Sequence, residues 1–425
     1  ASAFYAVGIK DKGIGIALKM EDGASSIVPY AILSVLTQLG VITPEEACSL
    51  PRYHDKNLYN DHHAVVGRTE LAFPGNPNSA HSGGRAAREE LDRITASIAA
   101  LLGAEPEEVI YTSGATESNN LAIKGLAQAS RHVGRHILST QLEHSSVGGS
   151  LTALQNQGYE IDLLDVDRRG QVDLEQLRDL LRKDTVLLSL SAVDSELGTV
   201  QPLEEVREIL KEYPNCRLHV DATQAVGRIP VRFTGCDTMS LALHKIGGLN
   251  GSGLLLKRKG LVLEPLLHGG ASTTIYRSGT PTLALAAAAE EALRRATGER
   301  EERTARVAAL RRRLEDGLKQ YPQVRVNSPA GAVPHILNLS VAGVRGSRFQ
   351  QALSDRGVCV SVKSACSSDG LPSKAVFAVS RDRKNALSSW RISLSHLTTE
   401  EEIDQFLTIF DACCRELTGQ GAGEE

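Results

Sequence analysis

Residues 240–253 read Ser-Leu-Ala-Leu-His-Lys-Ile-Gly-Gly-Leu-Asn-Gly-Ser-Gly. The apolar run from Met239 to Leu243 predicts a buried strand, and the glycine-rich residues 247–253 predict a loop after it. Lys245 therefore stands at the end of a buried strand, where it can lose water and be held in one direction. A lysine that forms a Schiff base needs those two conditions. The alternative is a surface lysine that closes a strand before a turn.

The composition is that of an ordinary globular protein. The 425 residues are 41% hydrophobic and 23% charged, and this length predicts two or three domains with a large core. A net charge of −4 and few aromatic residues do not favour nucleic acid or an anionic membrane as a partner. No apolar run reaches the length of a spanning helix. Seven cysteines without metal-type pairs, and no secretory signal, predict a cytoplasmic protein with reduced thiols.

Strands and helices alternate in the middle of the chain. Apolar runs predict strands at 108–112, 135–139, 160–166, 185–193, 216–221, 237–243 and 252–257. With helical segments between most of them, this pattern predicts an α/β fold, a mostly parallel seven-stranded sheet with helices on both faces. Further on, the pattern predicts one long helix over 281–320. A smaller α+β unit follows, with strands at 335–342, 358–363 and 389–395 and a final helix over 398–415.

Residues 111–117, Tyr-Thr-Ser-Gly-Ala-Thr-Glu, join the strand at 108–112 to a predicted helix. Small hydroxyl residues and a glycine at a helix N-terminus suit an anion, because the backbone N–H groups and the helix dipole point toward it. The same residue types are common as an ordinary N-cap. By itself, the segment leaves phosphate binding and capping both open.

Two further strand ends carry polar residues. Asp221 ends the strand at 216–221, where a buried acid needs a partner. That partner is either a pyridinium N–H or the backbone of the next helix. His144 follows the strand at 135–139, and it either stacks on a flat ring and moves protons or is structural.

A thiol and a cation lie near the C-terminus. Cys366 lies among small residues with Lys363 nearby, which are conditions for a reactive thiolate, whereas the other cysteines are interpreted as core. Arg391 between apolar neighbours fits a substrate carboxylate, with a structural ion pair as the alternative. A phosphate site, a strand-end acid, a loop histidine and a strand-end lysine on one parallel sheet match what pyridoxal phosphate requires.

From about Gly75 to Cys414 the sequence resembles the cysteine desulfurases of the aminotransferase class V family, which are related to selenocysteine lyases. The matching stretches are 75–77 with Ser79 and His81, 112–121, 143–144, 219–224, 244–245, 277–280 and 364–367. The resemblance implies fold type I of the pyridoxal-phosphate-dependent transferases. In that fold a mostly parallel seven-stranded sheet is followed by a smaller C-terminal α+β domain. It also implies a homodimer.

The resemblance implies which residues bind pyridoxal 5'-phosphate. The set is Ala115, Thr116, His144, Ser195, Asp221, Gln224, Ala242, His244, Lys245 and the partner subunit's Thr280. In it, Lys245 holds the cofactor and moves the Cα proton, and His144 stacks on the ring and assists proton transfer. Asp221 pairs with the ring nitrogen, Gln224 contacts the ring oxygen, and the phosphate lies against the Ala115–Thr116 turn.

The resemblance also implies how the substrate, L-cysteine, is handled. Arg391 binds the substrate carboxylate, with Ser195 nearby, and Cys366 attacks the substrate sulfur. The products are L-alanine and a persulfide, which passes to a sulfur-acceptor protein in iron–sulfur cluster assembly or tRNA thiolation. Three departures bear on cofactor affinity and rate: Ser195 replaces an Asn, Ala242 replaces a Ser, and residues 271–276 replace a Gln/Glu-containing segment.

The N-terminal segment is different. Residues 1–72 lack the family's opening strand with its Leu-Asp-Asn-Ala-Ala-Thr-Thr-type motif, and resemble instead the C-terminal end of an asparaginase II-type amidohydrolase. The matching stretches are 7–19, 21–23, 60–62 and 65–67. The division implied is that fragment at 1–72, a large cofactor-binding domain at 73–265, the long helix and small domain at 266–418, and a disordered tail at 419–425.

Three other functions compete with cysteine desulfuration. A selenocysteine lyase would share the fold and cofactor. The missing motif and Ser195 favour a catalytically impaired member that acts as a binding or scaffold protein. An amidohydrolase would rest on residues 1–72 alone, and a fragment of that size cannot hold a full amidase site.

Overall fold

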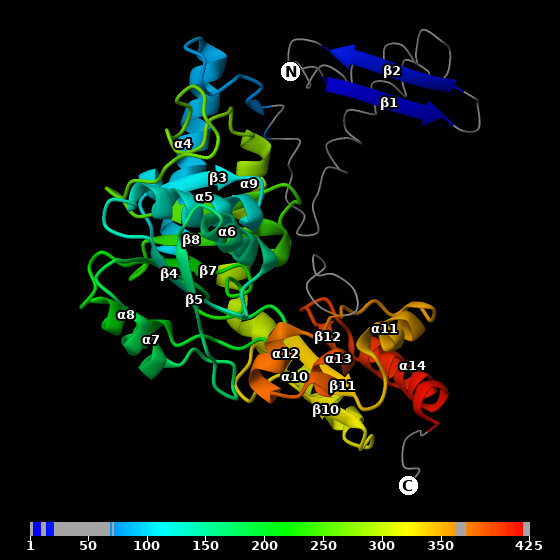
Figure 1. Ribbon diagram of the computed structural model, residues 1–425. Coiled ribbons are helices and arrows are strands. Elements are labelled where there is room, and N and C mark those ends of the chain that lie inside the picture. Colours follow the sequence, from blue (N-terminus) through cyan, green and yellow to red (C-terminus); the bar gives the residue numbers. More distant parts are fainter. Residues whose placement is uncertain (1–2, 10–13, 21–68, 70–71, 363–370, 420–425) are drawn as a thin grey trace.

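The computed structural model describes residues 3–9, 14–20, 69, 72–362 and 371–419 (Figure 1). At the N-terminus, β1 (Ala3–Ile9) and β2 (Ile14–Met20) pair antiparallel as a two-stranded sheet, with Ile9 opposite Ile14. Among the described helices, none has the length and hydropathy needed to cross a bilayer.

A seven-stranded sheet forms the centre of the molecule, in the order β3-β9-β8-β7-β6-β4-β5. Its strands are β3 (Val109–Thr112), β4 (His136–Thr140), β5 (Glu160–Leu164), β6 (Thr185–Ser191), β7 (Arg217–Asp221), β8 (Thr238–Ala242) and β9 (Gly253–Lys257). The only antiparallel pairs in this sheet are those of β9 with β3 and β8, and the other pairs are parallel. The predicted mostly parallel sheet of seven strands is therefore confirmed.

Helices cover both faces of this sheet (Figure 1). One face packs on α5 (Ala115–Ala129) and α6 (Ser145–Gln155). The other packs on four helices: α4 (Ser82–Leu102), α7 (Leu174–Leu180), α8 (Leu203–Leu210) and α9 (Leu283–Gly298). Successive strand residues alternate between these two cores, as in β9, where Leu255 faces one core and Leu254 and Leu256 face the other. Burial on both faces explains the apolar residues that face these two cores, whereas β5 at the edge of the sheet is only partly buried.

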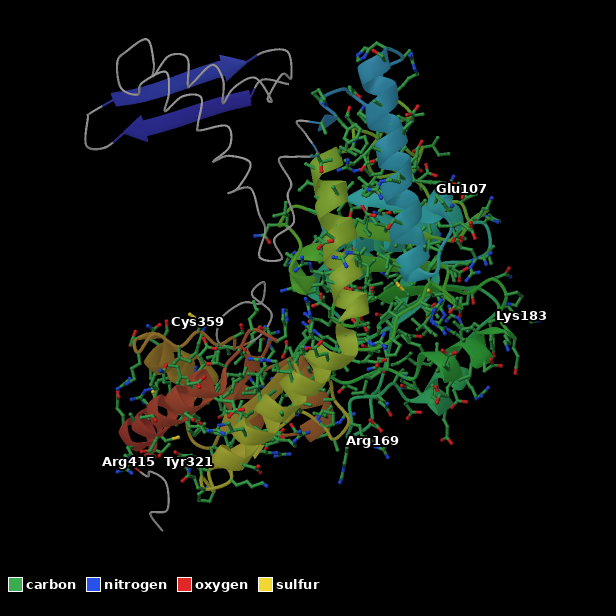
Figure 2. The ribbon with its side chains drawn as sticks, turned by 180° about the vertical axis from the view of Figure 1, so that it is seen from behind. Glu107, Arg169, Lys183, Tyr321, Cys359 and Arg415 are labelled. Carbon is green, nitrogen blue, oxygen red and sulfur yellow. The ribbon has the colours of Figure 1, made fainter. Side chains whose placement is uncertain are left out.

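The prediction of one long helix over 281–320 is wrong. The chain forms α9 and then α10 (Arg300–Leu318), with Glu299 between them at φ −100° and ψ 7°. Figure 2 shows the two helices meeting at an angle. Gly298 has a low helix propensity, and each helix packs in a different core. Leu293 of α9 lies in the core of the large sheet, whereas Leu314 of α10 lies in the C-terminal core.

The C-terminal unit is a three-stranded antiparallel sheet with helices against it. Its strands are β10 (Val324–Val326), β11 (Ile336–Val341) and β12 (Ser389–Ser393), in that order. Its helices are α11 (Gly346–Ser354), α12 (Lys374–Ser380), α13 (Arg383–Ser388) and α14 (Glu400–Thr418). Phe349 stacks on Trp390 with ring centroids 5.2 Å apart, and Phe410 packs beside both rings.

The predicted strand at 358–363 is also wrong over its described residues. Ser361 makes one isolated antiparallel bridge with Arg391, and β10 supplies the third strand of the sheet instead. Val358 and Val360 are half-buried and pack against the C-terminal core, whereas Cys359 between them is exposed. The segment therefore lies beside the outer edge of β12 without forming a strand.

Candidate active site

The predicted site residues follow the carboxyl ends of the parallel strands. Asp221 ends β7, His144 follows β4, and Ser195 follows β6. Lys245 lies in a short 3-10 helix, Leu243–Ile246, that begins directly after β8. The strand predicted through Leu243 thus ends one residue earlier. Ligands of open α/β sheets bind at this edge.

The N-terminus of α5 forms an open anion cradle beside β9. Gly114 has φ 152° and provides no side-chain cap, Ala115 is half-buried, and Thr116 is exposed. A Cβ on Gly253 would lie 2.4 Å from the Gly114 Cα, so only glycine permits this approach of β9 to the loop. The first N–H groups of the helix are therefore presented by backbone alone, as phosphate sites require.

Asp221 is 6% exposed and receives two hydrogen bonds. Asn119 Nδ2 donates to its Oδ2 at 2.8 Å, and the backbone N–H of Thr223 donates to its Oδ1 at 3.0 Å. Both neighbours are hydrogen-bond donors, so the Asp221 carboxylate acts only as an acceptor in these contacts and can accept a further N–H. The alternative role, a cap for the next helix, accounts for the hydrogen bond from Thr223 but not for the hydrogen bond from Asn119.

His144 is held from one side of its ring. Its Nδ1 accepts from the backbone N–H of Ser146 at 3.1 Å and lies 2.8 Å from the Ser146 Oγ. Ser146 Oγ in turn accepts from Asn119 at 2.9 Å. His219, fully buried, contacts Asn119 Oδ1 at 3.0 Å and Thr238 Oγ1 at 2.9 Å, and burial lowers the pKa of His219 to about 4.

Lys245 carries the electrostatics of a reactive amine. Partial burial lowers the pKa of Lys245, and the positive charges of Arg391 and Arg228 lower it further. A lowered pKa leaves more of the amine unprotonated and nucleophilic. Burial and Lys245 together lower the pKa of the neighbouring His244. Ala242, buried at the end of β8, pairs with Gly253 and offers no hydroxyl.

Arg391 reaches from the C-terminal unit to the large sheet. Its Nη1 donates to the backbone carbonyl oxygen of Ser195 at 2.7 Å, and its Nε is buried without a hydrogen-bond partner among the described residues. A buried guanidinium N–H without an acceptor fits an anion that binds beside it. The carboxyl groups of Glu196 and Asp194 lie close enough to act on the Arg391 guanidinium, and burial raises the pKa of Asp194 to about 7. Elsewhere, burial also raises the pKa of Glu143 to about 7.

Among the described residues, Gln224 and Thr280 make no hydrogen bond to another predicted site residue. Gln224 Oε1 accepts a hydrogen bond from Arg228 Nη1. Thr280 is exposed on the loop that also carries Arg277, which pairs with Glu117 at 2.9 Å. Cys366 lies outside the described residues.

Sequence reasoning missed Asn119, Ser146 and His219, which join the predicted residues to one another. Asn119 and His219 lie inside stretches that match the family, but each is fully buried in the structure. Polar side chains among the apolar residues of a helix and a strand were the available signal, because buried polar groups need hydrogen bonds.

The description of the other cysteines as core needs one correction. Cys216, Cys236, Cys413 and Cys414 are buried and free, whereas Cys359 is exposed. Burial raises the pKa of Cys216, Cys236 and Cys414 to about 12, so these thiols are unreactive at neutral pH.

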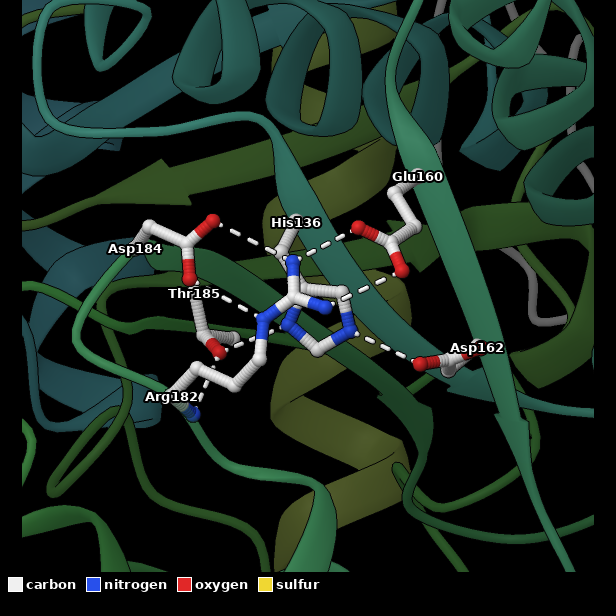
Figure 3. Close-up of polar contacts among 6 residues, drawn as sticks. All are labelled: His136, Glu160, Asp162, Arg182, Asp184 and Thr185. Carbon is white, nitrogen blue, oxygen red and sulfur yellow. Dashed lines mark hydrogen bonds and ion pairs between the residues drawn. The ribbon is translucent and has the colours of Figure 1, made fainter.

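At the opposite edge of the sheet, His136 lies between Thr185 and Asp162 (Figure 3). Its Nδ1 is 2.7 Å from Thr185 Oγ1 and its Nε2 is 3.1 Å from Asp162 Oδ2. This arrangement has the residue types of a hydrolytic triad, but His136 is 0% and Thr185 1% exposed. A substrate cannot reach them, so the three residues tie together the ends of β4, β5 and β6.

Comparison with known proteins relates most of the chain to one family and the N-terminal segment to another. The model of the aminotransferase class-V family matches residues 63–406, and that of the L-asparaginase II family matches residues 1–71. A NifS/IcsS protein homolog of Lactobacillus delbrueckii is 38% identical, over 79% of this chain and 89% of its own. Cysteine desulfurase IscS of Methanosarcina thermophila is 36% identical, over 79% and 84%. A solved NifS-like protein superposes with a TM-score of 0.78 at 33% identity, covering 86% of this chain and 99% of that one.

Proposed function

This chain belongs to the aminotransferase class-V family, and we propose that it uses pyridoxal 5'-phosphate to convert L-cysteine to L-alanine, leaving a persulfide on Cys366. The reaction class and the cofactor are those of its cysteine desulfurase relatives. The observation that carries the proposal is that Lys245, with its lowered pKa, lies at the same sheet edge as Asp221 and the open end of α5.

The described residues fit the cofactor. The N-terminus of α5 at Ala115 and Thr116 would hold the phosphate, with His244 and the partner subunit's Thr280. Asp221, which already receives two N–H donors, would accept a third from the pyridine ring, and His144 would stack on the ring. Gln224 retains its amide N–H₂ for the ring oxygen, because its carbonyl oxygen is taken by Arg228. When bound, the group supplies an electron sink that makes the Cα proton of an attached amino acid acidic.

The remaining residues handle the substrate. Arg391 and the backbone around Ser195 hold its carboxylate, since the Arg391 Nε has no other acceptor. Lys245 Nζ takes the Cα proton, and the product regains one proton at Cβ and one at Cα, the second being the proton that the Cys366 thiol gives up. The thiolate of Cys366 forms an S–S bond to the substrate sulfur as the Cβ–S bond breaks. L-Cysteine and a thiol therefore give L-alanine and a persulfide, with atoms and electrons balanced.

We further propose that the enzyme is a homodimer. Four large apolar side chains, Val262, Leu266, Leu267 and Ile275, are exposed within one short segment, with Ile275 67% exposed. Apolar side chains gathered in one exposed stretch are typical of an interface. The same segment leads into Thr280, which would reach a neighbouring subunit's site. Sedimentation of the wild type and of an Ile275→Lys variant tests this, and a monomeric wild type would contradict it.

The other assignments follow from the proposed reaction. The persulfide passes to a sulfur-acceptor protein of iron–sulfur cluster assembly or tRNA thiolation, and the free described cysteines support a cytoplasmic location. We divide the chain into a fragment at 1–72, a large domain at 73–265, and a long helical segment with a small domain at 266–418.

The test is an assay of alanine and sulfide from L-cysteine with added pyridoxal phosphate. It uses the full chain and the chain without residues 1–72, with Lys245→Ala as the inactive control. Equal amounts of alanine and sulfur support the proposal. A chain that binds the cofactor yet forms no alanine would instead support the scaffold function. Faster turnover of L-selenocysteine than of L-cysteine would make it a selenocysteine lyase.

A further inference from the structure

Six buried or half-buried side chains form one continuous hydrogen-bond chain behind the proposed cofactor site. From Thr238 it runs through His219 to Asn119, and there it branches to Asp221 and, through Ser146, to His144. Asn119 is the branch point, since it alone contacts both Asp221 and Ser146. The strands and helices that meet here are separated widely in sequence.

We propose that Asn119 is a positioning residue that holds the Asp221 carboxylate and, through Ser146, fixes the proton of His144 on Nε2. The proposal rests on the proposed function, because it concerns the residues that would meet the cofactor. It assigns a role to Asn119 and Ser146, which contact neither substrate nor cofactor, and a proton-donating role to one named atom of His144.

The orientation of the Asn119 amide is set by Asp221. A carboxylate only accepts, so the Asn119 atom 2.8 Å from Asp221 Oδ2 must be the donating Nδ2. The same Nδ2 then donates its second proton to Ser146 Oγ at 2.9 Å. Asn119 Oδ1 is left to accept from His219 Nε2 at 3.0 Å. His219 Nδ1 therefore accepts from the hydroxyl of Thr238.

The proton of Ser146 follows from this orientation. Because Ser146 Oγ accepts from Asn119, its own O–H is free to donate, and His144 Nδ1 lies 2.8 Å away. The backbone N–H of Ser146 points to the same nitrogen at 3.1 Å. A proton on His144 Nδ1 would face that N–H, so Nδ1 stays unprotonated and the ring proton sits on Nε2.

Burial makes this arrangement strong. Asn119, His219 and Thr238 are 0% exposed, and Asp221 and Ser146 are 6% and 8% exposed. Hydrogen bonds strengthen one another in such a water-poor setting, and an unpaired member is costly. His144 Nε2 makes no hydrogen bond to another described residue, so its proton remains available. At the start of the reaction His144 therefore donates a proton from Nε2 rather than accepting one there.

Two variants separate the two branches. Ser146→Ala breaks only the branch to His144, and its matched control is Ser150→Ala, a buried serine one turn later in α6 whose hydroxyl bonds to the Ser146 carbonyl oxygen. Asn119→Ala breaks both branches, and its control is Asn120→Ala, whose amide bonds only to the Thr116 carbonyl oxygen.

The first readout is the ¹⁵N NMR spectrum of histidine-labelled protein without added cofactor or substrate, with the His144 signals assigned from a His144→Gln sample. We expect the wild type and Ser150→Ala to show a protonated Nε2 and an unprotonated Nδ1. Ser146→Ala keeps the backbone N–H at Nδ1 but loses the nearer hydroxyl donor, so we expect a partial shift toward the tautomer that is protonated on Nδ1. A wild-type ring protonated on Nδ1, or identical His144 signals in Ser146→Ala and Ser150→Ala, would overturn the proposal. Neither outcome depends on whether the protein is a desulfurase.

The second readout is pyridoxal phosphate affinity by fluorescence titration. Loss of the donor that holds Asp221 weakens binding in Asn119→Ala by about tenfold or more relative to Asn120→Ala. Ser146→Ala leaves affinity within about threefold of the wild type while kcat falls and KM is unchanged. Equal affinity in Asn119→Ala and Asn120→Ala would remove the role of Asn119. A Ser146→Ala variant with unchanged kcat would remove the role of His144 Nε2.

Discussion

Arg391 Nη1 donates a hydrogen bond of 2.7 Å to the backbone carbonyl oxygen of Ser195. The two residues are far apart in sequence. Arg391 lies in β12 of the C-terminal sheet, whereas Ser195 lies in the loop that follows β6 of the large sheet. This contact joins the C-terminal unit to the edge where Lys245 and Asp221 lie. It leaves the buried Arg391 Nε without an acceptor among the described residues, which is the position that we assign to the substrate carboxylate.

Replacing Arg391 tests that assignment. Lysine keeps the charge but cannot hold Ser195 and a carboxylate with one planar group. We expect Arg391→Lys to raise the KM for L-cysteine roughly 10- to 100-fold, the loss of a charge-assisted hydrogen bond. The control is Arg325→Lys, on an exposed arginine of β10. Steady-state kinetics with an unchanged KM in Arg391→Lys would rule out the carboxylate role.

A substitution at Gly253 tests whether the anion cradle at the N-terminus of α5 is the phosphate site. A Cβ at this position would lie 2.4 Å from Gly114 Cα, so Gly253→Ala must push β9 away from the end of α5. We expect a loss of about 1–3 kcal/mol in the free energy of unfolding and a weaker affinity for pyridoxal phosphate.

The matched control for that substitution is Gly149→Ala. Gly149 lies in α6, and a Cβ there meets nothing within 4 Å, so this variant should be neutral or stabilised by up to about 1 kcal/mol. Denaturant unfolding and cofactor titration measure both effects. If Gly253→Ala binds the cofactor as tightly as Gly149→Ala does, the cradle is not the phosphate site.

The raised pKa of Asp194 predicts that the free energy of unfolding depends on pH. Burial, and then the nearby Glu196, raise the pKa of Asp194 from 3.8 to about 7. Between these values the folded state holds a proton that the unfolded state has lost, so stability falls as the pH rises to about 7 and then levels off. Asparagine does not titrate, and its oxygen can still accept from the N–H groups of Glu196 and Leu197.

We therefore expect Asp194→Asn to gain stability over the wild type as pH increases. The gain should be small at about pH 5 and on the order of 1 to a few kcal/mol at about pH 8. Urea unfolding at both pH values measures it, with the exposed Glu302→Gln as control. A difference between Asp194→Asn and wild type that does not change with pH would contradict a buried, proton-binding Asp194.

Local signals made part of the fold and site predictable. Most strands of the large sheet could be predicted because their apolar residues are buried on both faces, although β5 at the edge is only partly buried. Asp221, His144 and Lys245 could be predicted because each lies at or shortly after the end of such a strand. Their convergence then follows from parallel topology alone, since the carboxyl ends of parallel strands meet at one edge.

Features that depend on distant contacts were not readable. The role of Asn119 requires β7 and α6 to pack on α5, and no local pattern reports those distances. The break at Glu299 reflects two helices that pack in different cores. The edge segment at 358–362 has the residue types of a strand but makes only the single bridge at Ser361, because apolar β-branched residues suit an exposed edge as well as a strand.

The most direct test of the central claim is the intact mass of the full chain, loaded with pyridoxal phosphate and treated with one equivalent of L-cysteine in the absence of reductant. The account predicts that the wild type and Cys359→Ala, which lacks the exposed cysteine, each gain the mass of one sulfur atom and release one equivalent of alanine. Cys366→Ala should gain none. A sulfur atom retained by Cys366→Ala, or alanine absent from the wild type, would contradict the claim that Cys366 receives the sulfur of L-cysteine.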